Sequence, residues 1–158
     1  MKNAFTLNKL SADFYKDFSK DAYPEIERKP SRPYVVMIIK IEGTRFALPL
    51  RTNIRHNCCY KFKNTGRNTR ASTGIDFTKA VVISDEKYIG EAVTIDNEEF
   101  AELKRKFHFL ISQFKRYLSD FIRYREEGGD EFAARRFRFT TLRYFENEFL
   151  PRKKGKRL

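Results

Sequence analysis

The first half of the chain alternates short apolar runs with polar breaks, a pattern typical of β-strands. Residues 34–41 form a β-branched apolar run, and residues 44–50 follow after Glu42 and Gly43, so the two runs predict a hairpin. Pro49 has no N–H to donate to a ladder, which predicts that the second strand lies at a sheet edge or ends there. Residues 80–83 predict a further buried strand, and residues 88–89 could add a short one.

The N-terminal segment predicts a short strand followed by one helix. Residues 5–7 fit the strand, and Ser11 can cap a helix over residues 12–20 whose aromatic side chains face the core. Residues 21–33 contain three prolines, so they are expected to be irregular or extended.

The C-terminal half predicts helices. Asp96 can cap a helix that carries a long apolar stripe at spacings of three and four, and Gly128 and Gly129 end it. Asp130 can cap a last helix that reaches about Phe149. Strands followed by helices predict an α+β fold, in which an N-terminal helix and two long C-terminal helices cover a small antiparallel sheet. Residues 1–150 are expected to form a single domain, followed by a basic tail at 151–158.

The charge balance points to an anionic partner. The net charge is +12, and removing the five Lys and Arg residues of the tail still leaves +7 on the rest of the chain. Clustered Lys and Arg residues bind phosphate backbones through counterion release. An anionic membrane surface or duplex DNA is the rival partner, but the sequence has no amphipathic Trp/Lys anchor.

The remaining composition excludes several classes of site. Cys58 and Cys59 are adjacent, which suits two reduced thiols better than a disulfide staple or a zinc site. The sequence contains no glycine-rich phosphate loop, dinucleotide fingerprint or Asp/Glu metal cluster, so neither a metal nor a cofactor is expected. No apolar run approaches membrane-spanning length, and we expect a cytoplasmic bacterial protein without membrane contact.

Positive charge is concentrated between Gly43 and Ile75, a stretch that holds no Asp or Glu. Uncompensated basic residues favour RNA as the ligand, and long irregular segments of this kind are usually functional. The basic residues of this stretch are Arg45, Arg51, Arg55, Lys61, Lys63, Arg67 and Arg70.

Residues 51–56 could support cleavage of RNA without a metal. The 2′-hydroxyl of RNA is its own nucleophile, so the protein must align it, stabilise charge on the phosphorane and assist proton transfer. Arg51 and Arg55 suit phosphate, Thr52 and Asn53 can orient the reacting groups, and His56 can act as acid or base. The alternatives are a noncatalytic RNA-binding module and a simple turn with solvated arginines.

Two runs, residues 34–56 and residues 74–83, resemble the toxins of type III toxin–antitoxin systems, the ToxN/AbiQ group, and its CptN branch most closely. The resemblance implies a strongly bent sheet or barrel like that of the MazF/Kid toxins. It also implies a metal-independent endoribonuclease that leaves 2′,3′-cyclic phosphate and 5′-hydroxyl ends. The implied partners are cellular or phage RNA and a small repeat-derived, pseudoknotted RNA antitoxin, which the toxin processes and binds in a closed toxin–RNA assembly.

The resemblance also assigns residues. Thr52 matches the active-site hydroxyl after the Pro-Leu strand end, and Arg55, Arg32 and Lys79 match basic positions of the family. Arg replaces the Lys that many relatives carry at position 55, and a guanidinium is a poor proton donor, so chemistry favours His56 for proton transfer. Lys79 is expected to neutralise the phosphate or to pair with Asp76. The expected catalytic set is Thr52, Asn53, Arg55, His56 and Lys79, and the expected RNA-binding set is Arg32, Arg51, Lys61, Lys63, Arg67 and Arg70.

Overall fold

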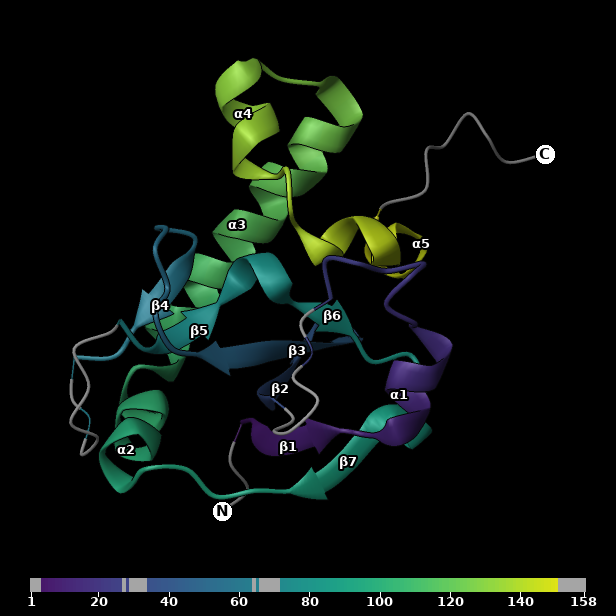
Figure 1. Cartoon of the computed structure of the whole chain (residues 1–158). Coiled ribbons are helices and arrows are strands. Elements are labelled where there is room, and N and C mark those ends of the chain that lie inside the picture. Colours follow the sequence, from purple (N-terminus) through teal and green to yellow (C-terminus); the bar gives the residue numbers. More distant parts are fainter. Residues whose placement is uncertain (1–3, 27, 29–33, 64, 66–71, 151–158) are drawn as a thin grey trace.

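The computed structural model describes residues 4–26, 28, 34–63, 65 and 72–150, and these form an α+β fold around one antiparallel sheet (Figure 1). The strand order is β4-β5-β3-β2-β1-β7, and β6 pairs with β3 beside this path. Within the described residues β4 and β7 do not pair, so the sheet is open and the closed-barrel alternative is wrong. The strands are β1 (Thr6–Leu10), β2 (Val35–Ile41), β3 (Thr44–Arg51), β4 (Cys59–Lys61), β5 (Gly74–Asp76), β6 (Val81–Val82) and β7 (Ile89–Ala92).

The predicted hairpin is confirmed as β2 and β3, which pair antiparallel from Ile41↔Thr44 to Val36↔Pro49. Glu42 and Gly43 both have positive φ, as a two-residue hairpin turn requires. The expectation that β3 lies at an edge or ends at Pro49 is wrong, because β3 has partners on both sides and continues to Arg51. On the side away from β2, β6 pairs at residues 46–47 and β5 at residues 50–51, so Pro49 falls between the two contacts.

The N-terminal strand lies inside the sheet, between β2 and β7. Ser11 caps α1 (Ala12–Asp17) as predicted, by accepting a hydrogen bond from the Phe14 N–H. The helix ends at Phe18, earlier than expected, and Phe14 is fully buried against the rings of Tyr88 and Phe18.

The long apolar stripe forms two helices, α2 (Asn97–Arg105) and α3 (Phe107–Glu127), which meet at Lys106. The predicted caps are confirmed: the Asp96 side chain accepts from the Glu99 N–H, and Gly128 ends α3 with φ of 76°. Phe114 of α3 packs edge-on against Phe46 of β3, which joins the helix to the sheet. No helix in the described part of the chain is both long and apolar enough to cross a membrane.

The expected second long helix is wrong. α4 (Glu131–Arg136) is followed by the 3-10 helix η3 (Thr141–Phe145) and by α5 (Glu146–Phe149). The threonines explain the break: Thr140 caps η3 through the Leu142 N–H, and the Thr141 hydroxyl donates to the Ala80 carbonyl oxygen. These bonds fix the segment against β6, where Leu142 is fully buried, and α4 folds back beside the end of α3 (Figure 1).

Candidate functional site

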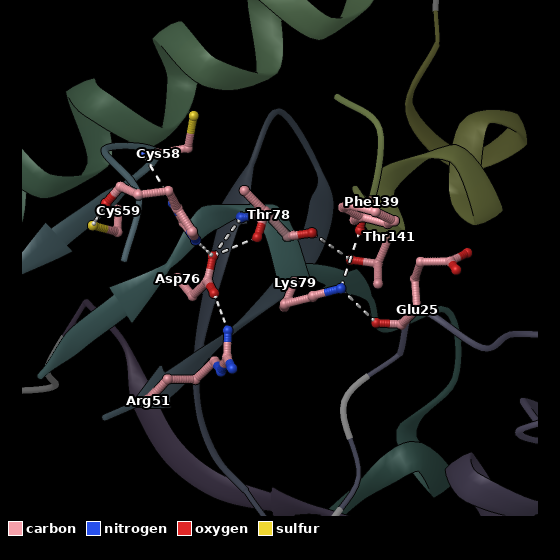
Figure 2. A network of polar contacts seen from close by, with 10 residues as sticks. Glu25, Arg51, Cys58, Cys59, Asp76, Thr78, Lys79, Phe139 and Thr141 are labelled. Carbon is pink, nitrogen blue, oxygen red and sulfur yellow. Dashed lines mark hydrogen bonds and ion pairs between the residues drawn. The ribbon is translucent and has the colours of Figure 1, made fainter. Parts of the chain in front are cut away.

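A buried carboxylate, Asp76, organises the site at the end of β5 (Figure 2). Its Oδ2 accepts a hydrogen bond from Arg51 Nη1 at 2.6 Å. Its Oδ1 accepts from the backbone N–H of Thr78 at 2.9 Å and from the Thr78 hydroxyl at 2.6 Å. Asp76 thereby caps the 3-10 helix η1 (Phe77–Lys79) and anchors the last residue of β3.

His56 lies on the same carboxylate. Its Nε2 is 3.2 Å from Asp76 Oδ1, within reach of an ion pair when the ring is protonated, although the nitrogen is not aligned for a hydrogen bond. Its Nδ1 accepts the backbone N–H of Cys58 at 3.1 Å, so in this arrangement the neutral ring carries its proton on Nε2. Both ring nitrogens therefore face the protein.

Asp76 remains ionised far into the acid range. Burial disfavours the charged form and by itself would raise the pKa of the carboxyl. The polar contacts with His56, Thr78 and Arg51 outweigh burial and lower the pKa of Asp76 from 3.8 to about 2. At neutral pH the site thus has a fixed negative charge underneath, which holds a guanidinium in place.

Strand pairing brings these residues together. Leu50 pairs with Ile75 and Arg51 with Gly74, which places the end of β3 beside the end of β5. β4 pairs with β5 on the other side, with Cys59 opposite Asp76. Gly74 makes the close approach possible, because a Cβ at this position would lie 1.9 Å from the Tyr60 carbonyl oxygen.

Above Asp76 opens a cleft of about 800 Å³. Arg51, His56 and Lys79 line it from the sheet, and Arg135, Arg136 and Phe139 line it from α4 and the segment that follows. The remaining lining residues are Asn57, Cys58, Thr78, Phe132 and Thr140, so none of the described residues along the cleft is Asp or Glu. Phe132 and Phe139 are exposed large aromatics, 68% and 59% accessible.

The structure brings some of the predicted residues together and leaves others apart. Arg51, His56 and Lys79 line the cleft. Thr52, Asn53 and Arg55 lie on the exposed turn after β3, outside the cleft lining, where Arg55 Nε donates to Asn53 Oδ1 at 3.3 Å. Asn53 has φ of 59°, and the buried Ile54 anchors this turn.

The predicted RNA-binding lysines lie away from the cleft. Lys61 and Lys63 are exposed on β4 and just after it. The backbone N–H of Lys63 donates to the buried carboxylate of Glu102 on α2 at 3.0 Å. Arg32, Arg67 and Arg70, together with the tail at 151–158, lie outside the described residues.

Lys79 connects the cleft to two distant segments. Its Nζ donates to the Glu25 carbonyl oxygen at 3.0 Å and to the Phe139 carbonyl oxygen at 3.1 Å (Figure 2). The Thr141 hydroxyl also contacts the Thr78 carbonyl oxygen, at 3.3 Å. These bonds hold the segment after α4 against η1, so they shape one wall of the cleft.

Sequence reasoning missed the α4 side of the cleft. Arg135 is exposed, and its side chain makes no ion pair or hydrogen bond to any described residue. Arg136 pairs with Asp120 of α3 at 2.8 Å. The signal was present in residues 135–139, Arg-Arg-Phe-Arg-Phe, because interleaved basic and aromatic residues are typical of nucleic-acid-binding surfaces.

Among the described residues, no three His, Cys, Asp or Glu side chains gather as a metal site would require. Asp76 and His56 are two such groups, but Arg51 and Thr78 take up the carboxylate. Comparison of the chain with known protein families, with curated proteins and with solved structures found no match.

Proposed function

We propose that this chain is a metal-independent endoribonuclease of the toxin type, and that single-stranded RNA binds in the cleft above Asp76. The observation that carries the proposal is the lining of that cleft. It combines cationic side chains with two exposed aromatic rings, and none of its described lining residues is a carboxylate. Such a surface suits RNA, because arginines bind phosphates while bases stack on aromatic rings.

The chemistry requires only what RNA and the cleft can supply. The 2′-oxygen attacks phosphorus, the bond from phosphorus to the 5′-oxygen breaks, and one proton passes from the 2′-hydroxyl to the leaving oxygen in two transfers. Arg135 and Arg136 line the α4 side of the cleft and would stabilise the phosphorane charge from there. Arg51 adds positive charge on the sheet side, held by Asp76.

His56 is the proposed proton-transfer group, and one of its hydrogen bonds must break before it can accept a proton. To accept the 2′-hydroxyl proton, Nδ1 must first release the Cys58 N–H. The side chain is 37% exposed, which leaves room for the ring to turn toward the cleft. Thr52 and Asn53, on the turn after Arg51, would then contact the RNA as it leaves the cleft.

The inward-facing nitrogens of His56 also favour a second candidate, a noncatalytic RNA-binding module that uses the same cleft. Both candidates require Arg135 for affinity, but only the nuclease requires His56 for turnover. Product analysis therefore separates them.

The test is incubation of the purified chain with 5′-labelled single-stranded RNA in EDTA. We expect fragments with 2′,3′-cyclic phosphate ends and no cleavage of the same sequence as DNA, which lacks the nucleophile. Arg135→Ala should weaken binding and cleavage together, while Lys115→Ala removes an equal charge from an exposed position of α3 outside the cleft and serves as the matched control. Salt-sensitive binding without cleavage would establish the second candidate, and absence of both binding and cleavage would refute the two.

We further propose that a folded, repeat-derived RNA occupies the same cleft as inhibitor. The proposal rests on the resemblance of residues 34–56 and 74–83 to the type III toxins and on the basic cleft. Co-expression with the DNA upstream of the gene should yield a complex with a small RNA. Purified RNA that binds Arg135→Ala as tightly as the unaltered chain would contradict the shared site.

A further inference from the structure

A second, smaller pocket opens next to the cleft, between α3 and the segment that leads into β4. Its volume is about 270 Å³, equal to about nine water molecules at roughly 30 Å³ each. It shares Asn57, Cys58 and Arg136 with the main cleft, so the two hollows are neighbours on either side of these residues. A strand of RNA that leaves the cleft past these residues would reach the pocket.

Two residues that line the pocket carry buried polar atoms without partners in the described part of the chain. Gln113 Oε1 and the hydroxyl of Tyr117 are buried without a hydrogen-bond partner among the described residues, and both residues line the pocket. Tyr117 is only 2% exposed. Burial raises the pKa of the Tyr117 phenol, and the nearby Thr140 lowers it by less. The two hydroxyl groups are not in hydrogen-bond geometry.

Gln113 Oε1 is a buried acceptor without a donor in the described chain, which is costly. A turn of this amide toward the pocket would let an occupant that presents N–H groups supply the missing donor. An amide oxygen accepts and the amide nitrogen donates, which matches the edge of a nucleobase.

The rim of the pocket suits the rest of a nucleotide. Phe109 is 55% exposed and borders the pocket, so its ring is open to stacking by a base. Arg116 is exposed one helical turn further along α3 from Ser112 and pairs with no described residue, so it can bind the adjoining phosphate.

We infer that this pocket holds one nucleobase of a bound RNA strand, that Phe109 stacks on it, and that Gln113 reads its hydrogen-bonding edge. The inference rests on the proposed function, because it names the specificity element of the same RNA-binding surface. It assigns sequence preference to α3 and RNA affinity to the main cleft.

The test measures binding apart from cleavage. The probes are four fluorescent pentanucleotides that carry uracil at every position except the central one, which is A, C, G or U. All four are fully 2′-O-methylated, which removes the nucleophile. We expect the affinities of the unaltered chain to spread over roughly tenfold, the discrimination typical of one well-formed base contact. Gln113→Leu should collapse that spread.

Two further variants keep the test decisive if Gln113→Leu fails to fold. Gln113→Glu replaces the amide donor with an acceptor and should shift the preference toward guanine, which presents adjacent N1–H and N2–H donors. Phe109→Ala, at an exposed position, should weaken all four pentanucleotides by roughly tenfold and leave their order unchanged. Lys115→Ala, the charge control on α3, should preserve the order and lower the affinity only slightly.

Equal affinity of the unaltered chain for all four bases would overturn the inference even if unmodified RNA is cleaved, and the nuclease proposal would then stand alone. A preference that survives both Gln113 variants would also overturn it. A preference that the Gln113 variants remove, without cleavage of unmodified RNA, would keep the base pocket and refute the nuclease.

Discussion

Removing the charge of Asp76 tests how the site is held. Asp76→Asn keeps the shape of the side chain but leaves Arg51 without its ion pair. The folded protein lowers the pKa of Asp76 from 3.8 to about 2. Since a tenfold change in proton affinity is worth about 1.4 kcal/mol, ionised Asp76 stabilises the fold by roughly 2 kcal/mol relative to its protonated form.

The pH range over which Asp76 stabilises the fold follows from its lowered pKa. A carboxyl with a depressed pKa binds its proton more readily in the unfolded chain. Its contribution is therefore complete well above pH 4 and is lost as the pH falls toward 2. The stability advantage of the unaltered chain over Asp76→Asn should shrink by about 2 kcal/mol between pH 5.5 and pH 2.

Urea unfolding followed by far-UV circular dichroism measures this advantage, since the chain has no Trp for fluorescence. Asp21→Asn, in the exposed turn after α1, removes an equal charge away from the site and serves as the matched control. An advantage that stays constant from pH 5.5 to 2, or grows in acid, would refute the claim that Asp76 is ionised by its partners.

Three other substitutions test separate elements. Gly74→Ala places a Cβ 1.9 Å from the Tyr60 carbonyl oxygen, so it should force β4 from β5 and lower the free energy of unfolding by more than the roughly 1 kcal/mol typical of point changes; an unchanged urea midpoint would contradict the close approach. Lys79→Met removes two hydrogen bonds to carbonyl oxygens and should speed proteolysis near Phe139, whereas protection equal to the unaltered chain would show that Lys79 does not hold the wall. Ser11→Ala should cost about 1 kcal/mol in urea unfolding through loss of the α1 cap, while Ser11→Asp, which can still cap, should cost less.

The sequence predicted the elements whose signals are local. The hairpin of β2 and β3 and the caps Ser11, Asp96 and Asp130 could all be read from neighbouring residues. The break at Lys106 could not, because the apolar spacing continues across it from Phe100 to Leu110. The end of α4 could not be read either, since Thr141 is held by the Ala80 carbonyl oxygen, 61 residues away in the chain.

The site was predictable to the same extent. The basic segment pointed to Arg51 and His56, which line the cleft, because their chemistry is visible one residue at a time. The role of Asp76 depends on the pairing of β3 with β5, which no local pattern encodes. The turn after Arg51 is exposed and lies outside the cleft lining, with Thr52, Asn53 and Arg55 on it. Residues next to Arg51 in sequence therefore need not line the same cleft.

The cleft is assembled from segments at residues 51–58, 78–79 and 132–140, and β1 pairs with β7 across more than 80 residues. Folding that depends on such long-range pairings is slow, and the ribosome adds about 5–20 residues per second. A nascent chain that has exposed only its sheet would still lack Arg135 and Phe139. The complete cleft can therefore form only after residues 132–140 have left the ribosome. Under the proposed function, this order would separate translation of the sheet from any action on the message being translated.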